Sequence, residues 1–103
     1  MKTLPIDLQK AEINQICQQY NISKLSLFGS VLRHDFTTES DIDILVEFEP
    51  GKTPGLAIIR IEDELNYLLG RVVDLRTPKD LSRYFRLLRV LQEAMVIYEQ
   101  VII

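Results

Sequence analysis

Apolar residues in the first quarter of the chain recur with the spacing of one helix face. That i, i+3, i+4, i+7 pattern predicts a helix over residues 6–19, with Asn21 as a left-handed stop. The stripe consists of Ile13, Ile16, Cys17 and Tyr20. A short apolar run follows at 24–28 and ends at Gly29-Ser30, which predicts a strand. The mostly polar residues 31–40 predict a turn of helix and a loop.

Between 41 and 48 the apolar and polar residues alternate, which predicts a second strand. One face carries Ile42, Ile44, Val46 and Phe48, and the other carries Asp41, Asp43, Leu45 and Glu47. Pro50-Gly51 ends this strand. A second helix is then expected, with Thr53 as N-cap, Pro54 at its first position and Gly70 just past its end. Its buried stripe is Ile58, Ile61, Leu65 and Leu68.

The remaining elements continue the alternation of strand and helix. Residues 71–76 predict a third strand, and Thr77-Pro78 opens a last helix over 79–93. The apolar stripe of that helix is Leu81, Tyr84, Phe85, Leu88 and Leu91. Residues 95–98 form a short strand or a tail. This order predicts an α/β (α+β) fold with a small β-sheet flanked by helices. Neither a repeat nor a linker interrupts it, so residues 1–103 are expected to form one domain.

Composition narrows the class of protein. A chain of 103 residues holds one small domain, which excludes a kinase or a TIM barrel. The net charge of −3 gives no electrostatic footprint for direct nucleic-acid binding. The single cysteine excludes an internal disulfide. No run reaches the roughly 18 apolar residues that span a membrane. We expect a cytoplasmic protein with no membrane partner.

The charge is concentrated in one segment. Residues 35–49 contain six acids and no Lys or Arg, yet about half of the segment is apolar. Asp41 and Asp43 lie two apart on the predicted strand, so both point the same way. Two neighbouring carboxylates among apolar residues are costly unless a cation compensates them. Mg²⁺ with oxygen ligands would do so, while the ordinary alternative is that Asp41 only caps a turn.

A third carboxylate and a turn extend this motif. Asp74 stands alone in the third strand, and it joins Asp41 and Asp43 if that strand pairs beside the second. Three converging carboxylates can build a two-metal phosphoryl-transfer site. The Gly29-Ser30 turn follows a strand, and such a turn lets backbone amides approach a phosphate. Taken alone, Gly29-Ser30 is also compatible with an ordinary strand-ending turn.

Together, Gly29-Ser30, Asp41-Ile42-Asp43 and a later Asp74 resemble the signature of the nucleotidyltransferase superfamily that includes DNA polymerase beta. The segments 27–33 and 40–46 resemble the minimal nucleotidyltransferase (MNT) antitoxins of the HEPN/MNT toxin–antitoxin systems. The resemblance implies a polymerase beta-like core with a small mixed sheet, and it covers nearly the whole chain. His34 stands where those proteins usually have a small residue.

The resemblance also implies roles for individual residues. Gly29, Ser30 and Arg33 would hold the triphosphate of ATP, and Asp41 and Asp43 would bind a metal pair. Asp74 would hold the metal nearer the attacking hydroxyl and assist its deprotonation. Two Mg²⁺ ions are implied, with Mn²⁺ as a substitute. The family transfers AMP to a tyrosine of a HEPN ribonuclease toxin, so such a toxin is the implied partner and protein substrate.

Two other functions remain open at this stage. One is a non-catalytic antitoxin that masks the toxin, and the other is a nucleotidyltransferase acting on a small molecule such as an antibiotic. A last feature is the recurrence of Arg83, Arg86 and Arg89 at every third residue. It indicates either a solvated helix face or a surface that docks an acidic patch or a phosphate.

Overall fold

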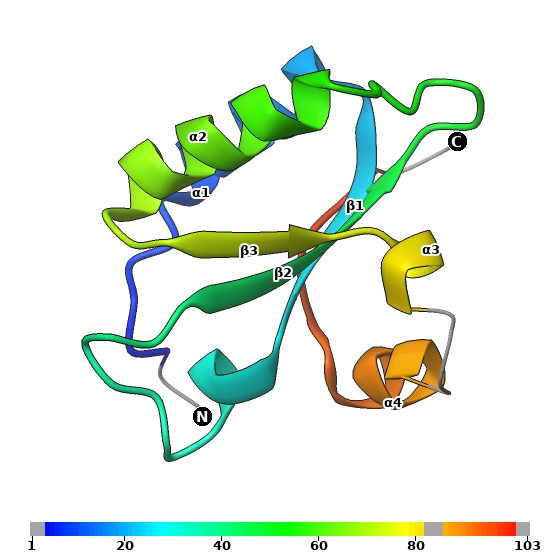
Figure 1. Ribbon diagram of the computed structural model, residues 1–103. Helices are drawn as coiled ribbons and strands as arrows, with labels where there is room; N and C mark the ends of the chain where they lie inside the picture. The colour runs from blue at the N-terminus through cyan, green and yellow to red at the C-terminus, as the bar shows by residue number, and fades with distance from the viewer. Residues whose placement is uncertain (1–3, 82–85, 101–103) are drawn as a thin grey trace.

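The computed structural model describes residues 4–81 and 86–100, apart from the side chains of residues 86 and 87. Within these ranges the helices and strands alternate (Figure 1). The helices are α1 (Lys10–Gln19), η1 (Gly29–Leu32, a 3₁₀ helix), α2 (Ala57–Leu69), α3 (Pro78–Leu81) and α4 (Arg86–Glu93). The strands are β1 (Ile22–Phe28), β2 (Ile42–Phe48), β3 (Val73–Arg76) and β4 (Met95–Glu99). None of the described helices is long and apolar enough to cross a membrane.

The four strands form one mixed sheet in the order β3-β2-β1-β4, which confirms the expected fold class. β1 pairs antiparallel with both β2 and β4, while β2 and β3 run parallel. The parallel pair follows from the chain order, because α2 crosses over between β2 and β3. The last apolar run is therefore a strand, and it lies at the edge of the sheet.

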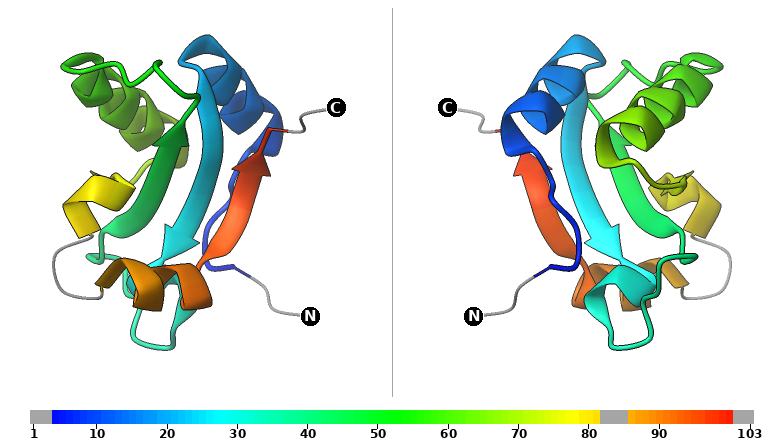
Figure 2. Two further views of the ribbon diagram at one scale, coloured as in Figure 1. Left: turned by 90° about the vertical axis from the view of Figure 1, so that its right-hand side faces the viewer. Right: turned by 90° about the vertical axis from the view of Figure 1, so that its left-hand side faces the viewer.

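The main core lies between one face of the sheet and the helices α1 and α2 (Figure 2). The predicted helix stripes supply Ile13, Ile16, Cys17, Ile61 and Leu65, and all are buried. The predicted inward face of the second strand supplies Ile42, Ile44 and Val46, which are fully buried. The expectation of two amphipathic helices over an alternating strand is confirmed.

A smaller cluster covers the opposite face of the sheet. Phe28, Leu45 and Leu81 are buried there, and Val90 of α4 and Ala94, the residue after α4, pack against them. Leu45 belongs to this face because strand side chains alternate, so it points away from Ile44 and Val46. Asp43 precedes Leu45 by two residues and therefore shares this face.

Two predicted helix starts are wrong. α1 begins at Lys10 rather than residue 6, since Gln9 adopts a left-handed conformation with φ of 50°. α2 begins at Ala57, and Thr53 is not its N-cap. Gly55 has φ of +61°, which a right-handed helix cannot contain, so residues 54–56 form a turn first. The ends were predicted correctly: Asn21 has φ of 58°, and Gly70 is the left-handed C-cap of α2.

The predicted last helix differs more. Its described residues form α3 and α4, and the expected stripe positions Tyr84 and Phe85 lie outside the described residues. Leu88 and Leu91 were expected in the core but are 60% and 47% exposed. The predicted stripe is therefore wrong at these two positions. The orientation of α4 is set instead by Val90 and Ala94.

Candidate active site

The Gly29 turn lies directly against Asp43. β1 ends at Phe28, whose partner across the antiparallel pair is Asp43, and η1 starts at the next residue. Gly29 has φ of +76°, and a Cβ placed there would overlap Oδ2 of Asp43 and lie 3.2 Å from its Cγ. Only glycine leaves room for this approach. The turn and the carboxylate predicted from the sequence are therefore one site.

The parallel pairing of β2 and β3 places Asp43 and Asp74 opposite each other in register. Both are partly buried, and both belong to the face of the sheet on which α3 and α4 lie. Asp41 is exposed and lies just before the first residue of β2. The predicted approach of Asp74 to Asp43 is thus present, and Asp41 flanks the pair from the preceding loop.

The electrostatics of Asp43 reflect this crowding. Burial raises the pKa of the Asp43 carboxyl above its ordinary value, and the negative charges of Asp74 and Asp41 raise it further. Arg76 and Arg33 oppose the rise in this pKa. The ionised carboxylate is therefore held at a cost, which a bound cation would relieve.

The donor set suits a hard divalent cation. Paired carboxylates supplemented by substrate phosphates are the usual ligands of Mg²⁺. Among the described residues, however, no group of three or more His, Cys, Asp or Glu is close enough to hold an ion. Arg76 explains part of this, because its Nε and Nη2 donate to the two Asp74 carboxylate oxygens at 3.0 and 3.3 Å. Asp43 and Asp74 would therefore bind the metal ion together with phosphate oxygens of a substrate, because the two carboxylates alone do not supply a complete set of ligands.

Side chains from α2 fix the strand that carries Asp74. Asn66 Oδ1 accepts a hydrogen bond from the Val73 backbone N–H at 2.7 Å, and Glu62 Oε2 accepts one from the Leu75 N–H at 3.2 Å. These N–H groups belong to an edge strand, which would otherwise leave them without a protein partner. The residues on both sides of Asp74 are thereby held, and with them the position of its side chain.

Arg71 does the same for the loop before Asp41. Its Nη2 donates to the carbonyl oxygens of Thr37 and Ser40, each at 2.7 Å. Its guanidinium carbon also lies 4.6 Å from the centre of the Phe36 ring. Sequence reasoning missed both Arg71 and Asn66, because their partners are backbone groups that no motif reveals.

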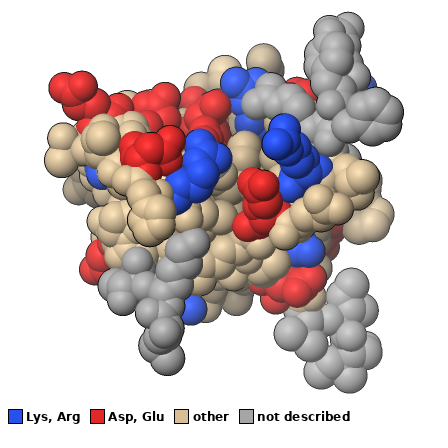
Figure 3. Space-filling view, turned by 90° about the horizontal axis from the view of Figure 1, so that it is seen from below, with Lys and Arg blue, Asp and Glu red and all other residues tan. Residues whose placement is uncertain are grey.

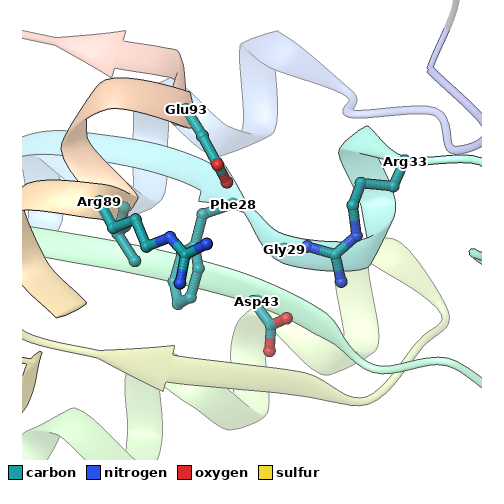
Figure 4. A pocket seen from close by; sticks show the side chains of 7 residues that line it. Phe28, Gly29, Arg33, Asp43, Arg89 and Glu93 are labelled. Atoms are coloured by element: carbon teal, nitrogen blue, oxygen red, sulfur yellow. The ribbon is translucent and has the colours of Figure 1, made fainter.

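A pocket of about 540 Å³ opens beside Asp43 (Figure 4). Its wall consists of Phe28, Gly29, Arg33, Asp43, Arg89, Val90 and Glu93. Of the predicted site residues, Gly29, Arg33 and Asp43 line it, while Ser30, Asp41 and Asp74 are not part of its wall. His34, which was not assigned a role, is exposed. The pocket adds α4 to the site, and with it Arg89 from the basic stripe and Glu93, which the sequence did not single out.

The end of the molecule that carries η1 and α4 is mixed in charge. Seen from that side, acidic and basic side chains alternate across the surface (Figure 3). The Lys and Arg side chains of the described residues do not form one extended basic surface on this face, as a nucleic-acid backbone would need. A few Lys and Arg side chains lie around carboxylates instead. This arrangement suits a small polyanion that binds as a complex with a metal ion.

Comparison with known proteins shows the family to which this chain belongs. A family model described as the nucleotidyltransferase domain matches residues 10–98. The chain belongs to this nucleotidyltransferase family. A protein of Methanocaldococcus jannaschii described as a candidate protein adenylyltransferase, MJ0435, is 38% identical over 85 residues. That match covers 82% of this chain and 89% of the relative.

A second relative is the protein adenylyltransferase MntA of Thermococcus cleftensis. It is 36% identical over 66 residues, which are 63% of this chain and 65% of the relative. Among solved structures, a candidate minimal nucleotidyltransferase matches with a TM-score of 0.70 and 33% identity. The match covers 84% of this chain and 87% of the other. The fold expected from the polymerase beta-like resemblance is confirmed.

Toxin–antitoxin complexes contain the same fold. One, solved with AMP-PNP, has a TM-score of 0.69 at 21% identity, covering 90% of this chain and 75% of the other. Another contains a tri-AMPylated HEPN toxin of Shewanella oneidensis with an MNT antitoxin, with a TM-score of 0.59 at 20% identity. It covers 88% of this chain and 70% of the other. At this level of identity the likeness concerns the fold.

Proposed function

We propose that this protein is an antitoxin that transfers AMP from ATP to a tyrosine of a HEPN-domain ribonuclease toxin and so silences it. The observation that carries the proposal is the register of Asp43 with Asp74 beside the Gly29 turn. The names of the relatives and the complexes that share the fold support the choice of acceptor.

In this reaction the tyrosine oxygen attacks the α-phosphorus of ATP. A bond forms between that oxygen and phosphorus, the bond from the α-phosphorus to the bridging oxygen breaks, and pyrophosphate leaves. When bound, Mg²⁺ ions would neutralise the charge that develops on the phosphate oxygens. Asp43 and Asp41 would hold the ions, while Asp74 would hold the ion nearer the tyrosine and accept its proton.

The Gly29-Ser30 turn has a separate role in the proposal. Its backbone and the Ser30 hydroxyl would bind phosphate oxygens close to the carboxylates, and Arg33 would neutralise part of their charge. Because Gly29 lies against Asp43, phosphate bound at the turn is held beside the metal ligands. Most of the rate would then come from positioning and electrostatic stabilisation.

The test is incubation of the protein with labelled ATP, Mg²⁺ and the purified HEPN-domain protein of its toxin–antitoxin pair. We expect label on that protein with the wild type and none with Asp43→Asn or Asp74→Asn. Asp63→Asn is the matched control, since Asp63 is an exposed acid on α2 and far from the Gly29 turn in sequence. Tight toxin binding without transfer by the wild type would refute the proposal.

The non-catalytic alternative makes the opposite prediction in cells. A folded Asp41→Ala, Asp43→Ala double variant would still rescue cells from the toxin if the antitoxin acted only by masking it. We expect rescue to be lost, because the variant lacks the proposed metal ligands. Labelling of an aminoglycoside in place of a protein would instead support a small-molecule acceptor.

A further inference from the structure

Helix α4 presents two charged side chains to the pocket, and two of its leucines are exposed. Arg89 and Glu93 are one turn apart and line the pocket beside Asp43 (Figure 4). Leu88 and Leu91, by contrast, are 60% and 47% exposed. Arg89 and Glu93 are also exposed, so both charges are open to a ligand that enters the pocket.

The position of α4 is fixed independently of those charges. Val90 and Ala94 pack against Phe28, Leu45 and Leu81 on the sheet. Residues 89, 90, 93 and 94 lie on one side of a helix, since they are one and four apart. Anchoring through Val90 and Ala94 thus directs the neighbouring Arg89 and Glu93 over the pocket.

The charged groups of Arg89 and Glu93 have no partner within the described part of the chain. The side chains of Arg89 and Glu93 form no ion pair and no hydrogen bond with another described residue. Arg33, on the opposite wall, is paired with Asp35 at 3.3 Å, and that pair is largely exposed. Two guanidinium groups therefore flank the Asp43 carboxylate, one just after η1 and one on α4, and the one on α4 forms no ion pair with a described residue.

A nucleoside triphosphate places different demands on the two ends of its phosphate chain. The α-phosphate must lie at the metal ligands, while the β- and γ-phosphates carry most of the charge away from them. A planar guanidinium is positively charged and donates hydrogen bonds to two phosphate oxygens at once. An ionised carboxylate has no donor and binds phosphate only through a metal ion. An arginine across the pocket from the Gly29 turn meets this demand.

We propose that Arg89 binds the β- and γ-phosphates of the nucleotide, so that α4 forms the second wall of the triphosphate site. This rests on the proposed nucleotidyltransferase activity and extends it to a helix outside the Gly-Ser and Asp motif. Glu93 opposes a polyanion through its like charge, so it lowers the affinity of the pocket for the nucleotide. The pocket thus combines one attractive and one repulsive group on the same helix face.

The experiment measures the affinities of the wild type for ATP and for AMP by calorimetry in Mg²⁺. Arg89→Ala should weaken ATP binding by about 10- to 100-fold and leave AMP binding unchanged, since AMP lacks the β- and γ-phosphates. Arg89→Lys should recover part of the loss. Arg60→Ala is the matched control, because it removes the same charge from an exposed position on α2 and Arg60 does not line this pocket.

Glu93→Gln supplies a test of sign, since it should tighten ATP binding. Circular dichroism spectra and melting temperatures would verify that each variant is folded. Unchanged ATP affinity in Arg89→Ala, or an equal loss for AMP and ATP, would overturn the assignment of Arg89. So would a weakening of ATP binding in Glu93→Gln. Failure of the wild type to bind ATP at all would instead refute the proposed function, which separates the two claims.

Discussion

Two glycines with the same φ allow the contact that Gly29 makes with Asp43 to be separated from the strain of its backbone. Gly29 and Gly51 both have φ of +76°, so an alanine at either position is forced into the left-handed region. That conformation costs a non-glycine residue roughly 1–2 kcal/mol, and loss of glycine's flexibility in the unfolded chain returns a part of it. Gly29→Ala and Gly51→Ala should each lose about 1 kcal/mol of stability.

The surroundings of the two glycines differ completely. A Cβ at Gly51 has no heavy atom within 4 Å, whereas a Cβ at Gly29 overlaps the Asp43 carboxylate. The carboxylate oxygen must retreat by about 1 Å to restore ordinary contact. This movement adds little to the loss of stability, because a terminal carboxylate can rotate away. It does displace a proposed metal ligand, and errors of this size can cost about 100-fold in rate.

The assay compares the two variants in thermal unfolding and in AMP transfer to the HEPN-domain protein. Both melting temperatures should fall by about 4–8 °C, the shift expected for 1 kcal/mol in a domain of this size. Transfer should persist in Gly51→Ala and fall by about 100-fold in Gly29→Ala. Equal transfer rates in two equally destabilised variants would refute the reasoning, because Gly29 would then matter only as a turn residue.

Other predictions follow from groups around the site and in the core. Asp43→Asn should raise the melting temperature while abolishing transfer. The folded-state pKa of Asp43 is raised, so its ionised form opposes folding, and this gain should shrink as the pH falls toward the range where the carboxyl is protonated. Asn66→Ala should lower stability by about 1–3 kcal/mol and slow transfer, because the Val73 N–H loses its partner. Chemical denaturation measures the loss of stability, and a destabilised variant that keeps the wild-type transfer rate would contradict the positioning role. Cys17 is fully buried, and burial raises the pKa of its thiol to about 12, so iodoacetamide should label it only on unfolding; rapid labelling of the folded protein would contradict this.

The centre of the site was predictable because it depends on local order along the chain. A strand that carries Asp43, a crossover helix and a strand that carries Asp74 lead to parallel neighbours. Alternation within each strand then puts the two carboxylates on one face. The Gly29 turn was predictable as the end of a strand, although its close approach to Asp43 needed the register of β1 with β2. Its phosphate-binding role stays a prediction.

The rest of the site depends on packing between distant segments. From the sequence, Arg89 was recognised only as part of a basic stripe. Its place at the pocket is set by Val90 and Ala94, which pack on the face of the sheet opposite α1 and α2. Arg71 is separated by more than 30 residues from the carbonyl groups that it binds. Neither role produces a periodic sequence pattern. Arg71 binds backbone carbonyl groups, and Arg89 lines a pocket, so each role depends on one side chain only.

The most direct test of the account is the intact mass of the HEPN-domain toxin after co-expression with this protein. The account predicts that the toxin gains the mass of one or more AMP groups with the wild type. It should gain none with Asp43→Asn and gain them again with the Asp63→Asn control. A toxin of unmodified mass, recovered from cells that the wild-type protein protects, would contradict the claim that this site works by AMP transfer.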